Sequence, residues 1–343
     1  MQISRNTSLL SRNTFGIDVQ AEEIVDYSSV AELQELVRSR TSKGTSKPLL
    51  HIGGGSNLLF LSDFKGMVLH SQICSMEVTS NNSETVSVRV GAGCVWDEWV
   101  EYAISCHWYG LENLSLIPGE VGAAAVQNIG AYGAEAKDFI TLVETVDLSS
   151  GELRTFGVDE LDYSYRSSRF KTDLKGRYAV TYVHFCLSRT FRPHLDYGGL
   201  RSAIEKSGTT EDKLTAAQLR QIIIDIRQAK LPDPKVLGNG GSFFINPVVE
   251  RPLYERIAAN YDKVPHYDID AKHVKIPAGW LIEQCGWKGR SMNRAAVYEK
   301  QALVLVNTGG ASGSDIMQLC RAIQTDVQSR FGISISPEVN IIG

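Results

Sequence analysis

Apolar and polar residues alternate along the chain in short runs that predict strands and helices in turn. In residues 85–90, Val86, Val88 and Val90 fall on one face, the two-residue period of a half-buried strand. Further strands are predicted at residues 48–52, 141–147, 178–188 and 302–307. We find no internal repeat and no low-complexity block, so the pattern predicts an α+β or α/β protein.

Helices are predicted where apolar residues recur every three or four positions after a capping signal. Ser29 and Glu32 form one capping box, and Thr215 and Gln218 form a second before a helix that Pro232 ends. Residues 99–104 and 314–331 are further helices, and Gly332 is placed to cap the latter. We expect a domain boundary near the helix that follows Thr215.

Two glycine-rich segments interrupt this pattern. The predicted strand 48–52 runs into Gly53-Gly54-Gly55-Ser56-Asn57, and residues 115–133 hold four glycines and few charges. Exposed backbone N–H groups suit a pyrophosphate. The spacing is not G-x-G-x-x-G, which disfavours a Rossmann site. Each segment alone could be a plain turn, but the pair favours two sides of a slot for one dinucleotide cofactor.

Three polar residues stand in settings that suit chemistry. Arg166 lies among aromatics in YSYRSSRFK and could offer a fork to a carboxylate, or it could be a solvated surface cation. Ser242 follows glycines in GNGGSFF and could deliver a proton, or it could sit in a β-bulge. Glu338 stands in an apolar terminal strand, where a buried carboxylate needs a partner, unless that strand is an edge facing water.

Composition narrows the classes of function. A chain of 343 residues predicts two or three domains, and a net charge of −4 gives a nucleic-acid partner no support. The six cysteines form no C-x-x-C pair, so we expect reduced thiols, and the scattered histidines suggest no metal site. The first 15 residues lack the apolar core of a signal peptide, and no run is long enough to span a membrane, so we expect a cytoplasmic protein.

Six ordered motifs carry a family resemblance across nearly the whole chain. They are HIGGGSNLL, IPGEVGAAAVQNIGAYG, YSYRSSRFK, KLPDPKVLGNGGSFFINP, IPAGWLIEQCGWKG and SPEVNIIG. The chain resembles the UDP-N-acetylenolpyruvoylglucosamine reductases, also called UDP-N-acetylmuramate dehydrogenases. The resemblance implies an α+β protein with an FAD-binding fold of the vanillyl-alcohol-oxidase type. Its expected parts are two FAD-binding subdomains, residues 1–76 and 77–226, and an α+β substrate domain, residues 227–343, whose last strand is free to return to the FAD domain.

The resemblance also implies a reaction in peptidoglycan precursor synthesis. NADPH reduces FAD, and flavin N5 then passes hydride to the vinyl carbon of UDP-N-acetylglucosamine enolpyruvate to give UDP-N-acetylmuramate. Ser242 is the implied proton donor, and Arg166 and Glu338 are the implied stabilisers of the developing charge. Glu338 would have to be protonated, or act through a partner, to donate a hydrogen bond.

The same motif matches imply the binding residues. FAD is expected at Gly53, Gly54, Gly55, Ser56, Asn57, Ile117, Pro118, Gly119, Gly122, Ala123, Gln127, Asn128 and Gly130. The sugar nucleotide is expected at Tyr132, Tyr197, Lys230, Asn246, Tyr267, Lys288 and Gln301. Tyr197 looks like the loop tyrosine that one branch of the family closes over its substrate. We expect no nucleic-acid or membrane partner, and a monomer.

The chain departs from the family pattern at a few positions. Family members often have Thr where this chain has Glu120, Pro at Ala125, Lys at Ile245 and Arg at Asn340. A carboxylate repels a pyrophosphate, so Glu120 is expected to point away from the glycine loop.

Two alternatives stay open. The first is an FAD-linked oxidase of an alcohol or a lactone, which would often carry a residue such as His51 tethered to the flavin. The second is a flavin-binding module without catalysis, which would be expected to lack one of Arg166, Ser242 and Glu338, and all three are present.

Overall fold

The structure is a computed structural model that describes residues 1–42, 44, 47–197 and 199–343. Gly198, in the segment that carries Tyr197, lies outside the described residues. The chain groups into two units, described separately below. The first contains Met1–Thr7, Ala21–Gly54 and Lys65–Ala229, and the second contains Ser8–Gln20, Gly55–Phe64 and Lys230–Gly343.

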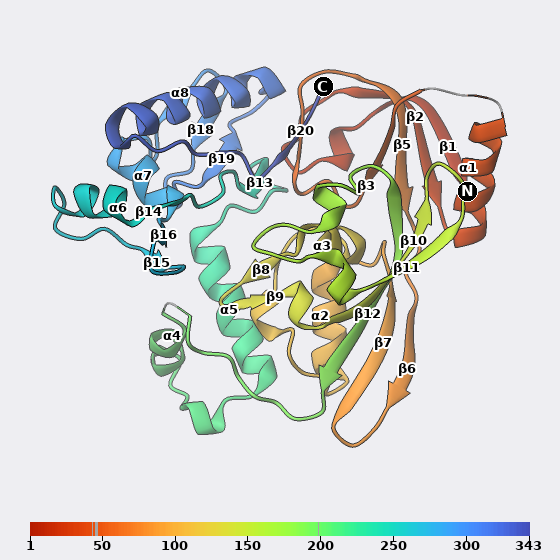
Figure 1. The fold of residues 1–343 in the computed structure, drawn as a ribbon, viewed down its shortest axis with the longest axis horizontal. Helices are drawn as coiled ribbons and strands as arrows, with labels where there is room; N and C mark the ends of the chain where they lie inside the picture. Colours follow the sequence, from red (N-terminus) through yellow and green to blue (C-terminus); the bar gives the residue numbers. More distant parts are fainter. Residues whose placement is uncertain (43, 45–46, 198) are drawn as a thin grey trace. The chain divides into compact units, whose positions relative to one another are not determined.

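The first unit holds a four-stranded sheet that leads into the glycine loop (Figure 1). Its strand order is β1 (Gln2–Ser8), β2 (Gln20–Tyr27), β5 (Phe64–Ser71), β3 (Leu49–Ile52). Helix α1 (Val30–Ser42) packs Leu33, Leu36 and Val37 against this sheet. The Ser29 hydroxyl accepts from the Glu32 N–H at 3.2 Å, as the first capping box predicts.

A five-stranded antiparallel sheet forms the larger core of the first unit. Its order is β11 (Leu153–Gly157), β10 (Ile140–Asp147), β12 (Tyr178–Ser188), β7 (Thr85–Gly91), β6 (Met76–Asn81). Val86, Val88 and Val90 are all buried, which confirms the predicted period of two. Helices α2 (Trp96–Ser105) and α3 (Val121–Gln127) pack into the same core, with Trp96 and Trp99 fully buried.

Two helices complete the first unit. Helix α5 (Ala216–Lys230) begins at the second capping box, where the Thr215 N–H donates to Gln218 Oε1 at 2.9 Å. Leu219, Ile222 and Ile223 of α5 are buried against α4 (Leu200–Lys206) and its flanks. The apolar spacing read from the sequence therefore confirms which face of α5 is inward.

The second unit has three small sheets and three α-helices, and most of these elements are labelled in Figure 1. The first sheet has the strand order β13 (Asn239–Ser242), β19 (Val304–Asn307), β18 (Ala295–Val297), β17 (Ser291–Met292). The second has the order β14 (Val248–Glu250), β16 (His273–Lys275), β15 (Tyr267–Asp268). In the third, β20 (Asn340–Ile342) pairs in parallel with β4 (Leu58–Phe60). The helices are α6 (Arg251–Ala258), α7 (Ala278–Gln284) and α8 (Gly313–Phe331). Gly332 ends α8 with φ 68°, as predicted.

Two predictions about elements are wrong in detail, and one segment without a prediction forms regular structure. Residues 115–133, for which no element was predicted, contain α3 and the short strand β8 (Gly130–Ala131), and β9 (Ala134–Glu135) follows. The sequence GSFFINPVV, residues 241–249, has the composition of a single strand, but residues 243–247 lie between β13 and β14. Glu338 precedes β20 instead of standing within it.

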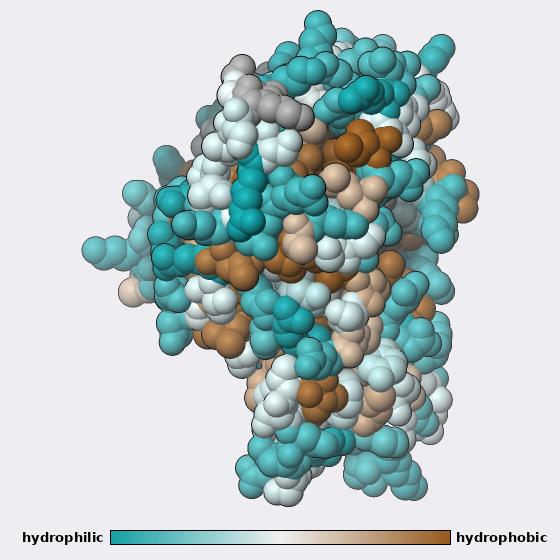
Figure 2. All heavy atoms as spheres, turned by 90° about the vertical axis from the view of Figure 1, so that its right-hand side faces the viewer, coloured by the Kyte–Doolittle hydropathy of each residue, from teal (hydrophilic) through white to brown (hydrophobic). Residues whose placement is uncertain are grey.

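On the face that Figure 2 shows, apolar residues are mostly interspersed with hydrophilic ones. In the described part of the chain, no helix combines the length and the apolarity needed to cross a bilayer.

Candidate active site

The start of the glycine loop lies against the second glycine-rich segment within the first unit. Strand β3 ends at Ile52, which is paired with His70 of β5, and Gly53 and Gly54 follow. A Cβ placed on Gly53 would lie 3.1 Å from Ala123 Cβ, and one on Gly54 would lie 3.4 Å from Gly119 Cα. The two stretches of backbone therefore approach each other closely, with the Glu120 side chain beside both Gly53 and Gly54, and such close approach of glycine backbone is a feature that suits a pyrophosphate.

The rest of the loop belongs to the second unit, and it also serves packing there. Gly55 has φ 65°, and a Cβ on it would lie 2.0 Å from the Arg12 carbonyl oxygen. The Asn57 side chain donates to the Glu338 carbonyl at 3.4 Å, and the Asn57 carbonyl accepts from the Asn340 N–H at 3.1 Å. Gly55 is therefore required by the fold whether or not it contacts a cofactor.

Strained backbone gathers in the second glycine-rich segment. Leu116, Asn128 and Tyr132 have φ values of 57°, 48° and 48°, a region that residues other than glycine rarely adopt. Asn128 is buried and donates to the Ser164 carbonyl at 2.9 Å, which helps hold the segment in place. Such strain is typical of functional sites when the surroundings over-determine it.

The other residues expected at FAD lie along the same segment with different exposure. Gly122 is buried, and a Cβ on it would lie 2.7 Å from Ala92 Cβ, so packing alone requires a glycine there. Pro118 is exposed, while Ile117, Gly119, Ala123, Gln127 and Gly130 are half-buried.

Glu120 does not point away from the glycine loop, which corrects the sequence-based expectation. Its side chain is buried, and Oε2 lies 3.2 Å from where a Cβ on Gly53 would be. Its Oε1 contacts His70 Nε2 at 2.9 Å. A carboxylate with a partner inside the protein can stay beside the loop, and the sequence offered no means of pairing Glu120 with a histidine 50 residues away.

Four residues expected at the site come together in the first unit. The Arg166 guanidinium donates to the Gly130 carbonyl at 2.6 Å, and Arg166 itself has φ 56°. Tyr132, two residues past Gly130, meets the Tyr197 ring edge to face at a centroid distance of 6.2 Å. This grouping places a cation and two phenols beside the glycine-rich segment.

Arg227 of α5 joins this group and was missed by sequence reasoning. It is half-buried, its charge acts on both Tyr132 and Arg166, and burial lowers the pKa of its guanidinium. Its Nε is buried, with no hydrogen-bond partner among the described residues. The signal was available, because Leu219, Ile223 and Arg227 follow at four-residue spacing and put an arginine on the apolar face of the helix. Lys230, the expected cation at the end of α5, is exposed.

In the second unit, the segments that carry Ser242 and Glu338 are hydrogen-bonded neighbours. The Phe243 N–H donates to the Leu303 carbonyl at 2.7 Å, and the Phe243 carbonyl accepts from the Glu338 N–H at 2.7 Å. Ser242 is exposed and Glu338 is half-buried. Phe243 and Phe244 are fully buried, so they fix the backbone that presents the Ser242 hydroxyl.

Two of the residues expected at the substrate meet at the start of α7. Asn246 Oδ1 accepts from the Ala278 N–H at 2.9 Å, and Gln301 Oε1 lies 3.3 Å from the position of a Cβ on Gly279. Lys288 follows the other end of α7, where it pairs with Glu283 at 2.8 Å.

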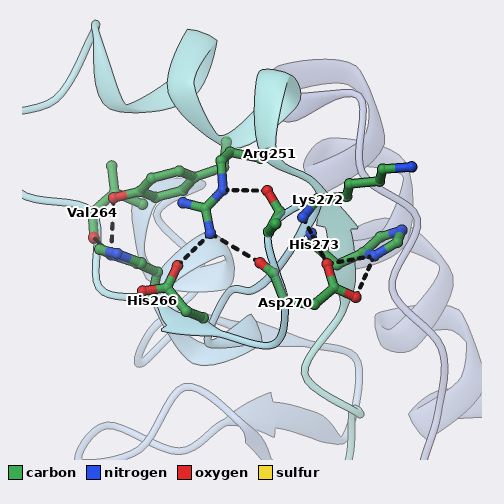
Figure 3. Close-up of polar contacts among 9 residues, drawn as sticks. Arg251, Val264, His266, Asp270, Lys272 and His273 are labelled. Atoms are coloured by element: carbon green, nitrogen blue, oxygen red, sulfur yellow. Dashed lines mark hydrogen bonds and ion pairs between the residues drawn. The ribbon is translucent and has the colours of Figure 1, made fainter.

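Tyr267 lies on a small hairpin that polar contacts hold (Figure 3). Arg251 donates to Asp268 at 2.6 Å and to the Asp270 carbonyl at 3.1 Å. The Lys275 ammonium lies 5.4 Å from the centre of the Tyr267 ring. A hollow of about 520 Å³ opens beside the hairpin, lined in part by the rings of Tyr254, Tyr261, His266 and Tyr267.

His51, the candidate for a flavin tether in the oxidase alternative, is engaged elsewhere. Its Nε2 contacts the Tyr27 hydroxyl at 2.8 Å, and the two rings stack. Burial lowers the pKa of His51 to about 4, so the ring is neutral near neutral pH. This environment argues against a covalent link to a cofactor at His51.

Each half of the chain matches a known protein family. Residues 21–157 match the FAD binding domain, and residues 233–342 match the C-terminal domain of UDP-N-acetylenolpyruvoylglucosamine reductase. The reductase of Bacteroides fragilis is 53% identical over 98% of this chain and 98% of its own length. That of Porphyromonas gingivalis is 42% identical over the full length of both proteins.

Solved structures agree on the fold. The UDP-N-acetylenolpyruvylglucosamine reductase of Thermus caldophilus matches with a TM-score of 0.69 over 100% of both chains at 22% identity. A p-cresol methylhydroxylase matches with a TM-score of 0.52 over 96% of this chain and 84% of its own at 11% identity. The α+β, FAD-binding fold of the vanillyl-alcohol-oxidase type is therefore confirmed. With relatives this similar over their whole lengths, the chain belongs to the UDP-N-acetylenolpyruvoylglucosamine reductase family, a family of FAD-dependent oxidoreductases that act on a peptidoglycan precursor.

Proposed function

We propose that this protein reduces UDP-N-acetylglucosamine enolpyruvate to UDP-N-acetylmuramate with NADPH. When bound, FAD supplies the redox chemistry, taking a hydride from NADPH and giving it from N5 to the vinyl CH2 carbon of the substrate. That carbon becomes a methyl group, and the neighbouring carbon, which carries the ether oxygen and the carboxylate, then needs one proton. Full-length similarity to the reductases supports this assignment.

The residues of the second unit suit the proton transfer. The observation that carries this step is the hydrogen bond from the Glu338 N–H to the Phe243 carbonyl at 2.7 Å, which fixes the Ser242 and Glu338 segments side by side. Ser242 is the proposed donor, because its hydroxyl is exposed at the end of β13 on a backbone fixed by buried aromatics. Glu338 is the proposed partner that stabilises charge near the same segment.

Arg166 of the first unit is proposed to stabilise the developing charge on the substrate carboxylate. Its backbone is strained at φ 56°, and its guanidinium is anchored on Gly130, so the side chain is held before any ligand arrives. Gly53 to Asn57 and the residues from Ile117 to Gly130 given above are the proposed FAD contacts. They take no part in the proton transfer.

The sugar nucleotide is proposed to contact Tyr132, Tyr197, Lys230, Asn246, Tyr267, Lys288 and Gln301. The tyrosine-lined hollow beside Tyr267 supports a place for a ring system, and Lys263 lies on its rim. The edge-to-face contact of Tyr132 with Tyr197 supports the assignment to the branch with a substrate-closing tyrosine. A monomeric state, a cytoplasmic location and the three-part division at residues 76 and 226 are further parts of this proposal.

Anaerobic half-reactions test the proposal directly. NADPH should bleach the visible flavin band of the purified yellow protein, and the enolpyruvyl sugar nucleotide should then restore it without oxygen. NADH in place of NADPH measures the preference between the two reductants. Restoration of the band by oxygen alone, at a rate comparable to that with the sugar nucleotide, would instead support the oxidase alternative.

A further inference from the structure

A buried histidine, His70, lies on the strand next to the start of the glycine loop. His70 of β5 is paired in register with Ile52, the last residue of β3, and it is only 9% exposed. Its Nδ1 contacts Asp26 Oδ1 at 2.8 Å, and its Nε2 contacts Glu120 Oε1 at 2.9 Å. One imidazole therefore joins two carboxylates inside the first unit.

The geometry favours a charged ring. Both ring nitrogens face carboxylate oxygens, and an imidazole donates from both nitrogens only when it is an imidazolium. In the neutral tautomer with its proton on Nε2, Nδ1 would instead accept from the Gln72 amide, which lies 2.9 Å away. In both states Nε2–H donates to Glu120.

Apart from the two carboxylates, the titratable side chains near His70 are those of His51 and Tyr27, and both are neutral near neutral pH. His51, whose pKa is lowered to about 4 mainly by burial and then by the charge of His70, is uncharged. Burial raises the pKa of Tyr27, so its hydroxyl keeps its proton. The two carboxylates contact opposite nitrogens of the ring, and no cluster able to hold a metal ion occurs among the residues that the structure describes. A protonated His70, shared with Asp26, is thus the cation in contact with Glu120.

Glu120 needs such a partner because of its position. Its Oε2 lies 3.2 Å from where a Cβ on Gly53 would be, and its Oε1 lies 3.7 Å from the same position on Gly54. An unpaired carboxylate here would repel any anion bound by the backbone of these glycines, and repulsion in a partly buried site is only weakly screened.

We propose that His70 is a positioning residue for FAD, because it turns the Glu120 carboxylate inward and compensates its charge so that Gly53 and Gly54 can accept the cofactor pyrophosphate. This goes beyond the proposed function by assigning a role to a residue outside the catalytic set. It rests on that function only in taking the glycine loop as the FAD site.

The test is a double-mutant cycle on FAD affinity, measured by titrating FAD into apoprotein and following flavin fluorescence. His70→Gln keeps an amide donor for Glu120 but removes the positive charge, so FAD should bind about tenfold to a hundredfold more weakly. Glu120→Gln alone should bind FAD at least as tightly as the wild type. The double variant should return to within about threefold of Glu120→Gln, because the charge that His70 offsets is gone.

His184→Gln is the matched control. His184 Nε2 contacts Glu144 Oε1 at 2.7 Å in the same unit, so this variant also breaks a histidine–carboxylate contact, but away from the glycine loop. Its FAD affinity should equal that of the wild type. Thermal melting of each apoprotein shows whether folding has changed. If His70→Gln does not fold, Glu120→Thr carries the test, since removal of His70 should then be tolerated in that background.

Three results would overturn the inference. The first is that His70→Gln binds FAD as tightly as the wild type. The second is that His70→Gln weakens FAD binding equally in the wild type and in the Glu120→Gln variant. The third is that Glu120→Gln alone weakens FAD binding as much as His70→Gln does. The equal loss would show that His70 only supports the fold, and the last would make Glu120 itself a contact of FAD. In each case a wild-type protein that binds FAD leaves the proposed function standing. A wild-type protein that binds no FAD would contradict the proposed function instead.

Discussion

Ser242 is the residue on which the proposed proton transfer depends. Its hydroxyl is exposed at the end of β13, and its backbone pairs with Val304 of β19. Ser242→Ala should leave flavin reduction by NADPH unchanged and slow reoxidation by the enolpyruvyl substrate by about 10² to 10⁴, the usual contribution of general acid catalysis. Stopped-flow measurement of the two half-reactions separates these effects.

Ser291→Ala serves as the control for Ser242→Ala. Ser291 is an exposed strand serine of β17 in the same sheet, so its loss tests the effect of removing any such hydroxyl. Both half-reactions should stay at wild-type rates. An equal slowing of both half-reactions in Ser242→Ala would remove Ser242 from the role of proton donor.

Single residues show where a sequence stops being informative. The glycines of the loop and Arg166 could be singled out as candidate site residues because their types are unusual for their settings. The direction of the Glu120 side chain could not be predicted, because it depends on a contact with His70, 50 positions earlier in the chain. The pairing of β3 with β5 is what brings His70 close to the start of the glycine loop. Arg227 could have been found from its place on an apolar helix face, but its buried Nε could not.

At the level of elements, one charged cluster crosses three adjacent strands of the large sheet. Glu144 of β10 is held by a two-pronged contact from Arg89 of β7, at 2.6 and 2.7 Å, and by His184 of β12. The hydrogen bonds from Arg89 lower the pKa of Glu144 from its ordinary 4.5 to about 2. The cluster thus links strands that are not neighbours, since β12 lies between β10 and β7.

This pKa shift predicts a pH-dependent part of the stability. Because the folded pKa is depressed, the stabilisation is complete above about 4.5 and is lost as the pH falls from there towards about 2. Glu144→Gln should lower the free energy of unfolding near neutral pH by about 1 to 2 kcal/mol, after allowance for solvent screening. The difference between wild type and variant should shrink below about pH 4.5, which urea unfolding at several pH values would measure.

Glu77→Gln is the matched control, because Glu77 is exposed and approaches the same Arg89 only to 3.9 Å. Its unfolding free energy should follow that of the wild type at every pH. If the difference in unfolding free energy between wild type and Glu144→Gln did not change with pH, the Glu144 carboxylate would contribute nothing to stability through its charge.

Element boundaries show the same limit of sequence reasoning as single residues. Strand β12 and helix α5 have clear periods and capping residues, and their observed bounds agree closely with prediction. Helix α3 was not predicted because its sequence, VGAAAVQ, has no amphipathic period. It forms where its small side chains can lie close to Ala92 and Gly53, which is a tertiary cause.

For the whole molecule, the fold class and family could be read from ordered motifs, but the grouping into units could not. Ser8–Gln20 and Gly55–Phe64 group with the C-terminal residues, because Thr14 contacts Gly55 and Asn239 and because β4 pairs with β20. Long-range backbone pairing of this kind leaves no local pattern. The glycine loop consequently continues from the first unit into the second between Gly54 and Gly55.

Binding of FAD at the glycine loop should affect the stability of the protein. A ligand that binds only the folded protein stabilises it by mass action, by about 2.7 kcal/mol at 100 times its dissociation constant. The melting temperature should therefore rise with FAD concentration. Hydrogen exchange should slow in residues 53–57 and 115–133, the proposed cofactor contacts, and should stay unchanged in the Tyr267 hairpin.

Riboflavin is the matched ligand control, because it carries the flavin ring but neither the pyrophosphate nor the adenosine. If the glycine loop holds the pyrophosphate, riboflavin should leave exchange in residues 53–57 unchanged at concentrations where FAD slows it. If both ligands slowed exchange equally, the assignment of the pyrophosphate to this loop would be contradicted. Gly53 and Gly54 would then have only a packing role, like that of Gly55 against Arg12.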